Sequence, residues 1–343
     1  MFAFACVALL ATSSVDGVFR EQGLRAAEAR GEFPRLTSVL VDQNGKTVAE
    51  AYFNESDPDT LHDTRSATKS VTALALGIAI GEGRIRSVSA PAFAFLADLK
   101  PFAQDGPLES QITLEDFLTM SSALDCNDDD PRSPGNEENM YPERVWARWA
   151  VDLPVQAGYV RDASGRGAFS YCTAGTFLLG QIIQRAAGIG VDRYTEEKLL
   201  KPLGIERWQW SRSPAGEVMT GGGLRLRSRD LAKIARMVLD GGRWEGKQVV
   251  PARWIESALT VHRKANPSQD YGYLFWRRDY ETGCGKRSGW YMSGNGGNAI
   301  VMMKDLNAVA VVTRTHYSSK GMHQQTTRLL EEQVLPQLAC AAR

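Results

Sequence analysis

The sequence predicts an α/β (α+β) protein with an antiparallel sheet that is flanked by helices and built from both ends of the chain. Strand patterns gather at residues 36–53 and 271–313, while the stretch between them alternates between helical patterns and long loops. The dipeptide Asn44-Gly45 separates two apolar runs, which is the strongest short signal for a β-hairpin. Because strands at both ends enclose a helical middle, we expect a sheet domain, an inserted mostly helical domain and an active-site cleft between them. The expected bounds are 18–84 with 245–343 for the sheet domain, and 85–244 for the helical domain.

The first elements follow from apolar periodicity. Residues 18–30 form an amphipathic helical pattern, and residues 36–42 and 46–53 are the two strands of the hairpin. A polar loop over 54–65 comes next. The helix expected over 66–80 is apolar almost all round, which is typical of a buried helix.

Capping and breaking residues set the limits of the later elements. Thr113 is the expected N-cap of a short helix over 112–120, and Ser228 is the expected cap of a helix that Gly241-Gly242 ends. Residues 125–141 are rich in Asp, Asn, Pro and Gly, which predicts a loop. The other expected helices are 145–150, 174–187, 191–200, 230–239, 251–259 and 322–338, and the expected C-terminal strands are 271–277, 289–293, 299–303 and 308–313.

Size and charge exclude several classes of protein. At 343 residues the chain is long enough for a large core and about two domains. Forty Lys and Arg residues balance 40 Asp and Glu residues, so no global basic field exists to attract nucleic acid. The four histidines show no H-E-x-x-H spacing and no cysteine pair has C-x-x-C spacing. We therefore expect no nucleic acid, no metal and no cofactor.

The N-terminus carries a weak targeting signal. Residues 2–11 are all apolar and are followed by Thr-Ser-Ser, as in the core of a secretory signal. We therefore expect residues 1–17 to be a signal-like segment and the protein to be periplasmic or secreted. The basic residues that usually precede such a core are missing, so a ragged apolar N-terminus on a cytoplasmic protein is the alternative. The run is too short to cross a bilayer as a helix, and we expect no integral membrane span.

The pattern with the most direct chemical meaning is Ser66-Ala-Thr-Lys69 at the head of the buried helix. Residues three apart share a helix face, so the Lys69 amine can reach the Ser66 hydroxyl. The first N–H groups of a helix have no partner inside it, which leaves the Ser66 N–H free to donate to an oxyanion. Burial would lower the pKa of Lys69, as a general base at neutral pH requires. The same spacing also arises by chance with a solvated lysine, so the motif alone leaves both interpretations open.

Two further stretches carry candidate residues. Tyr171 lies just before an apolar helix, where free N–H groups and a nearby ammonium can stabilise a phenolate. The run Ser293-Gly-Asn-Gly-Gly-Asn298 lies between two predicted strands, and the Gly297 N–H there could be a second oxyanion donor. The alternatives are a tyrosine that only packs and an ordinary hairpin turn. The candidate substrate-binding residues of these two stretches are Thr173, Gly294, Asn295, Gly296 and Asn298.

These motifs occur in a familiar order. A Ser-x-x-Lys motif, a tyrosine motif about a hundred residues later and a Gly-rich strand near the C-terminus resemble the serine β-lactamase and penicillin-binding superfamily. The chain is most similar to the class C-related branch, which contains carboxylesterases, D-aminopeptidases, D,D-peptidases and 6-aminohexanoate-dimer hydrolases. The resemblance runs from about residue 20 to the C-terminus and includes residues 112–124, 221–232 and 241–246. It implies a β-lactamase/transpeptidase-like fold.

The resemblance also implies a role for each candidate residue. Ser66 attacks a carbonyl and becomes acylated, and Lys69 and Tyr171 share the proton transfers. Which of these two is the general base is left open. The N–H groups of Ser66 and Gly297 form the implied oxyanion hole.

Two positions depart from the family pattern. The β-lactamases of this branch have Tyr-x-Asn where this chain has Tyr171-Cys172-Thr173, and Lys-Thr-Gly where it has Gly294-Asn295-Gly296. The missing lysine would bind the carboxylate of a β-lactam, a contact worth roughly ten- to a hundredfold in affinity. We therefore expect a small-molecule ester or amide as the substrate. The alternatives are a D,D-peptidase or weak β-lactamase, and a non-catalytic relative that only binds ligands.

The resemblance has one consequence for the cysteines. It places the loop after Leu124 near the Tyr171 segment, which implies a disulfide between Cys126 and Cys172. Two free buried thiols are the alternative.

Overall fold

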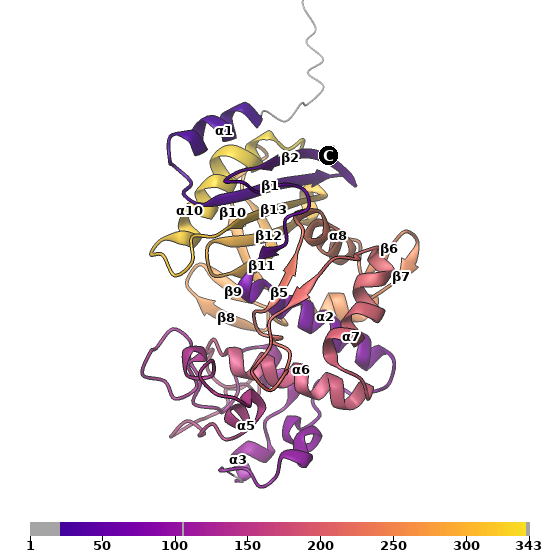
Figure 1. Cartoon of the computed structure of the whole chain (residues 1–343), viewed down its shortest axis with the longest axis vertical. Helices are drawn as coiled ribbons and strands as arrows, with labels where there is room; N and C mark the ends of the chain where they lie inside the picture. The colour runs from indigo at the N-terminus through magenta and orange to yellow at the C-terminus, as the bar shows by residue number, and fades with distance from the viewer. Residues whose placement is uncertain (1–20, 105, 341–343) are drawn as a thin grey trace, which may run out of the picture.

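An eight-stranded antiparallel sheet forms the upper half of the molecule (Figure 1), in the order β2-β1-β13-β12-β11-β10-β9-β8. The structure, a computed structural model, describes residues 21–104 and 106–340. The strands of this sheet are β1 (Leu36–Gln43), β2 (Lys46–Tyr52), β8 (Arg263–Asn266), β9 (Gln269–Tyr271), β10 (Trp276–Tyr280), β11 (Arg287–Gly294), β12 (Asn298–Met303) and β13 (Ala308–Arg314). Strand β1 lies between β2 and β13, with Val41 opposite Ala310. This confirms the antiparallel sheet built from both chain ends.

The central strands are buried on both faces, which explains why they read as continuous apolar runs. Side chains alternate between two hydrophobic clusters, one against each face of the sheet. The cluster shared with α1 (Glu21–Ala29) and α10 (Met322–Leu329) contains Val301, Met303, Ala310 and Val312. The cluster shared with α2 (Thr68–Gly81), α6 (Thr173–Ala187) and α8 (Ser228–Leu239) contains Ile300, Met302, Val309 and Val311.

Helices flank the sheet and fill the lower half of the molecule, where Figure 1 shows α3, α5 and α6. The α-helices are α1 (Glu21–Ala29), α2 (Thr68–Gly81), α3 (Pro107–Ser110), α4 (Leu114–Leu118), α5 (Trp146–Val151), α6 (Thr173–Ala187), α7 (Val191–Thr195), α8 (Ser228–Leu239), α9 (Ala252–Ala258) and α10 (Met322–Leu329). Helix α8 packs on β1, β12 and β13, although it falls inside the segment 85–244. The division of the chain into two domains stays a prediction.

Short strands and single helical turns complete the fold. A three-stranded sheet joins β3 (His62–Asp63), β5 (Leu224–Leu226) and β4 (Gln209–Trp210), and a two-stranded one joins β6 (Arg243–Trp244) and β7 (Lys247–Gln248). The 3₁₀ turns used below are η1 (Arg65–Ala67) and η3 (Glu137–Asn139).

Most element predictions agree with the structure, and three of them need correction. The strand predicted over 271–277 is wrong, because β9 ends at Tyr271, β10 begins at Trp276, and Leu274 between them has a φ of +58°. Ser228 is not the cap of α8, since Arg227 holds that position and Ser228 Oγ lies 2.5 Å from Ser38 Oγ. The loop predicted over 54–65 contains the short strand β3. Thr113 does cap α4, where its side chain accepts a hydrogen bond from the Asp116 N–H.

No helix in the part of the chain that the structure describes is long and apolar enough to cross a bilayer. The signal-like segment predicted at residues 1–17 lies outside the described residues.

Candidate active site

Ser66 lies in η1, the single 3₁₀ turn that leads into the buried helix α2. The end of β11 presses against this turn, because a Cβ placed on Gly294 would lie 1.8 Å from Thr64 O and 3.3 Å from Ala67 N. Only glycine permits so close an approach of two backbones. The Gly-rich end of β11 is therefore a wall of the site that contains Ser66.

Lys69 is buried beside Ser66, with 1% of its surface exposed. Its Nζ donates to Ser66 Oγ at 3.0 Å, to Thr173 Oγ1 at 2.8 Å and to Gly221 O at 2.6 Å. These three acceptors hold the amine in place, and none of them is a carboxylate. Burial lowers the pKa of Lys69, while the negative charges of Glu137 and Asp128 oppose that shift. The amine can therefore give up its proton far more easily than an exposed lysine.

Tyr171 covers the same pair from the other side. Its ring centroid lies 5.0 Å from Lys69 Nζ, and the ring of Trp276 packs against it at 5.7 Å. Burial raises the pKa of Tyr171, and its hydrogen bond with Ser66 works in the opposite direction. Because its hydroxyl is bonded to Ser66 and its ring lies beside the Lys69 amine, Tyr171 is placed to take part in proton transfer at Ser66.

A cleft of about 510 Å³ opens in front of Ser66 and Tyr171. Its aromatic wall comes from β10 and β11, and its acidic wall comes from the loop over 125–141 and from η3. The aromatic residues are Trp276, Tyr280 and Tyr291, and the acidic ones are Asp128, Asp129 and Glu137. Met322 and His323 at the start of α10, together with Gly294 and Asn295, also line the cleft.

The structure separates the candidate substrate-binding residues into two groups. Gly294 and Asn295 line the cleft. Thr173 is fully buried and faces Lys69. Asn298 is also buried, and its amide donates to Asn295 O at 2.7 Å, while the Gly296 N–H donates to Met322 Sδ at 3.1 Å. These last three residues shape the site from behind and do not face the cleft.

The structure does not bring Gly297 to Ser66. Gly297 is absent from the described residues that line the cleft, and its carbonyl accepts a hydrogen bond from Thr326 Oγ1 at 2.6 Å. A Cβ on Gly297 would lie 2.8 Å from Met322 O, so this residue packs toward α10. Asn295, which follows the end of β11 and precedes Gly297 by two positions, does line the cleft.

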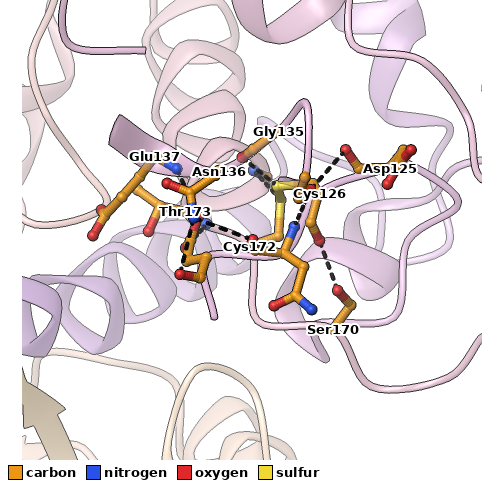
Figure 2. The surroundings of a disulfide bond; sticks show 12 residues. Asp125, Cys126, Gly135, Asn136, Glu137, Ser170, Cys172 and Thr173 are labelled. Carbon is orange, nitrogen blue, oxygen red and sulfur yellow. Dashed lines mark hydrogen bonds between the residues drawn. A yellow bond between two sulfur atoms is a disulfide. The ribbon is translucent and has the colours of Figure 1, made fainter. Parts of the chain in front are cut away.

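The part of the chain that the structure describes contains two disulfides. Cys126 and Cys172 are joined by one bond, as the resemblance implied, and Cys284 and Cys340 by the other. Figure 2 shows the first bond between the Ser170–Thr173 segment and the loop that carries Gly135 and Glu137. It ties the segment of Tyr171 to the loop that supplies the acidic wall of the cleft.

Two groups that the structure places at this site were not predicted from the sequence. The Gly221 carbonyl holds Lys69 through the backbone, so its residue type gave no signal. Asp128 lies in the stretch 125–141, whose composition predicted only a loop. The signal that could have singled it out is the implied proximity of the loop after Leu124 to Tyr171. No group of three or more His, Cys, Asp or Glu side chains within residues 21–104 and 106–340 is arranged to hold a metal ion.

The comparisons with known proteins agree with this geometry. The model of the beta-lactamase family matches residues 35–334. The 6-aminohexanoate-dimer hydrolase of Paenarthrobacter ureafaciens is 28% identical over 285 residues, which cover 78% of this chain and 67% of that protein.

Solved structures show the same fold at low sequence identity. The D-stereospecific amidohydrolase of a Streptomyces species superposes with a TM-score of 0.68 at 18% identity. The superposition covers 91% of this chain and 97% of the amidohydrolase chain. A penicillin-binding protein of Bacillus halodurans also has a TM-score of 0.68, at 16% identity, covering 89% of this chain and 98% of its own. With the family match over residues 35–334, these findings show that the chain belongs to the beta-lactamase family.

Proposed function

We propose that this protein is a serine hydrolase that cleaves a small ester or amide through an acyl-enzyme on Ser66. The observation that carries the proposal is the buried Lys69 amine, 3.0 Å from Ser66 Oγ and held by neutral acceptors. A buried ammonium costs free energy unless it is paired or used, and a lysine with a lowered pKa is a suitable base for a serine nucleophile.

The proposed reaction has two halves, acylation of Ser66 and hydrolysis of the acyl-enzyme. In each half the Lys69–Tyr171 pair takes one proton from the attacking hydroxyl or water and then gives one to the departing group. The Ser66 hydroxyl proton passes to the Lys69–Tyr171 pair while Oγ bonds to the substrate carbonyl carbon. The pair then protonates the leaving group as its bond to that carbon breaks. A water molecule attacks the acyl ester, gives its proton to the pair, and Ser66 regains a proton as it leaves.

The negative charge on the carbonyl oxygen needs two N–H donors. The Ser66 N–H is one donor, and we assign the other to Asn295 in place of Gly297, because Asn295 lines the cleft with Ser66. Losing one such donor typically costs a hundredfold to a thousandfold in rate.

The walls of the cleft favour one kind of substrate. Carboxylates at Asp128, Asp129 and Glu137 repel an anionic acyl group and attract an ammonium, while the aromatic wall suits an apolar chain. A linear amide or ester with an amino group fits this description. Such a substrate is consistent with the activity named for the Paenarthrobacter relative.

The first test is covalent labelling. Wild-type protein and Ser66→Ala are exposed to a fluorophosphonate and measured by intact mass. We expect one adduct that the variant lacks, followed by turnover of an aryl ester or an amino-terminated short amide in preference to a β-lactam. No adduct on folded wild-type protein would contradict the proposal, and preferential turnover of the β-lactam would contradict the substrate class.

We also propose that the protein works in an oxidising compartment. Two disulfides support this, since such bonds form and persist in secreted and periplasmic proteins. Mass spectrometry of non-reduced peptides from the native source tests it, and free thiols at all four cysteines would contradict it.

A further inference from the structure

Asp128 is a charged residue in the wall of the cleft that the proposed catalytic steps do not use. It lines the same cavity as Ser66 and Tyr171, and it follows the disulfide cysteine Cys126 by two residues. Burial raises the pKa of Asp128 to about 6. Two charged groups face it, Lys69 from α2, which opposes this shift, and Glu137 from η3, which adds to it.

The hydrogen bonds of Asp128 reach both sides of the disulfide. Its Oδ2 accepts from the Thr173 N–H at 2.7 Å, and its Oδ1 accepts from the Glu137 N–H at 3.0 Å. Its own N–H donates to Tyr171 O at 2.8 Å. One side chain and its backbone therefore fix the residue before Cys172, the residue after it and the first residue of η3.

Thr173 extends this arrangement to the nucleophile. Its N–H donates to Asp128, and its Oγ1 accepts from Lys69 Nζ at 2.8 Å, which in turn donates to Ser66. Asp128 thus acts on Lys69 in two ways, through the position of Thr173 and through its charge. Figure 2 shows Thr173 and Glu137 next to each other beside the disulfide.

We propose that Asp128 is a positioning residue for the Ser66 centre: its ionised carboxylate fixes Thr173 beside Lys69 and supplies the negative charge that the buried amine faces, while its backbone N–H holds Tyr171. The proposal rests on the serine hydrolase function proposed above. Both carboxylate oxygens of Asp128 accept hydrogen bonds from N–H groups. Protonation of Asp128 would therefore place an O–H donor against one of these N–H donors and break that hydrogen bond.

The test is the pH dependence of fluorophosphonate labelling. The Lys69–Tyr171 pair must lose one proton whichever residue is the base, and Asp128 must also have lost its own. Below about pH 6 the logarithm of the wild-type rate should therefore fall with a slope that approaches two per pH unit. The Asp128→Asn side chain does not ionise, so only one of the two deprotonations remains. The logarithm of the labelling rate of this variant should therefore fall with a slope of one per pH unit. Its acid limb should also move to lower pH, because loss of a nearby negative charge lowers the pKa of Lys69.

Asp130→Asn is the matched control. It removes the same charge from the same loop, but the Asp130 carboxylate accepts hydrogen bonds from Arg132 and does not line the cleft. We expect the control to keep the wild-type slope and midpoint. Asp128→Glu restores the charge, and we expect it to recover the steeper slope even if its rate is lower. Thermal unfolding at each pH shows that the rates refer to folded protein.

Three outcomes overturn the proposal. The first is an Asp128→Asn variant that is slower by one constant factor at every pH, which is what a purely structural role predicts. The second is an Asp128→Glu variant with a slope of one, which would decide the matter even if Asp128→Asn failed to fold. The third is wild-type protein that forms no adduct at any pH, which would overturn the serine hydrolase function itself and this role with it.

Discussion

Removing the disulfide between Cys126 and Cys172 should weaken the fold and slow the chemistry at the same time. The bond closes a loop with a sequence separation of 46 residues. The chain-entropy relation for such a loop gives about 4 kcal/mol at 25 °C, as the loss expected for a double Cys→Ala variant. Reactivity should fall as well, because Cys172 follows Tyr171 directly and Cys126 is two residues from Asp128.

The second disulfide provides a matched control. The bond between Cys284 and Cys340 has a sequence separation of 56 residues, and loop entropy grows only with the logarithm of length. Its removal should therefore also cost about 4 kcal/mol. Neither of these two cysteines lines the cleft, so we expect that variant to be labelled by a fluorophosphonate at the wild-type rate.

Urea unfolding without reductant measures the stability of both double variants, and labelling is measured at a temperature where both remain folded. The expected result is two similar losses of stability and only one loss of labelling rate. Equal labelling rates in the two variants would refute the argument that the first bond holds the catalytic segment in place. A loss of less than about 1 kcal/mol from either bond would refute the loop-entropy estimate.

Three further predictions concern single residues. Thr173→Val removes an acceptor from the Lys69 amine and should slow hydrolysis about ten- to a hundredfold, while an unchanged kcat/KM would contradict that role. Gly294→Ala should abolish labelling and lower Tm, because the added Cβ would meet Thr64 O at 1.8 Å; an active variant with the wild-type Tm would show that this wall yields. Burial lowers the pKa of His62 to about 4, below its unfolded value, so the protein should lose up to about 3 kcal/mol of stability as pH falls from about 6.5 to 4. In His62→Gln this pH-dependent loss of stability should be absent when the free energy of unfolding is measured in urea across this pH range. An identical pH dependence of stability in both proteins would show that other groups cause the loss.

The periodicity of apolar residues was sufficient to predict the long strands and helices. The strands over residues 298–314 and the buried helix after Ser66 are set by local apolar patterns that the tertiary structure reinforces. The strand predicted over 271–277 failed because a turn at Leu274 divides an apolar run that has no Gly or Pro at that point. The strand β3 has two residues, and so short an element has no period to detect.

The candidate site was predictable where chemistry depends on side-chain type. Ser66, Lys69 and Tyr171 meet in the structure as their motifs indicated. Gly297 was a poor choice, because the sequence of a glycine-rich turn does not say which N–H faces the cleft. Asp128 was missed because its role depends on backbone contacts with segments more than 40 residues away.

The pairing of β1 with β13 places a demand on how the chain folds. Leu36 and Arg314 are neighbours in the sheet, although 278 positions (314 − 36) separate them in a sequence of 343 residues. The hairpin of β1 and β2 is only marginally stable alone, and its apolar face stays exposed until β13 has been synthesised. Such non-local pairing gives a high contact order and slow folding. The sheet therefore cannot be completed before β13 has been made, and the exposed strand edges until then favour aggregation and chaperone binding.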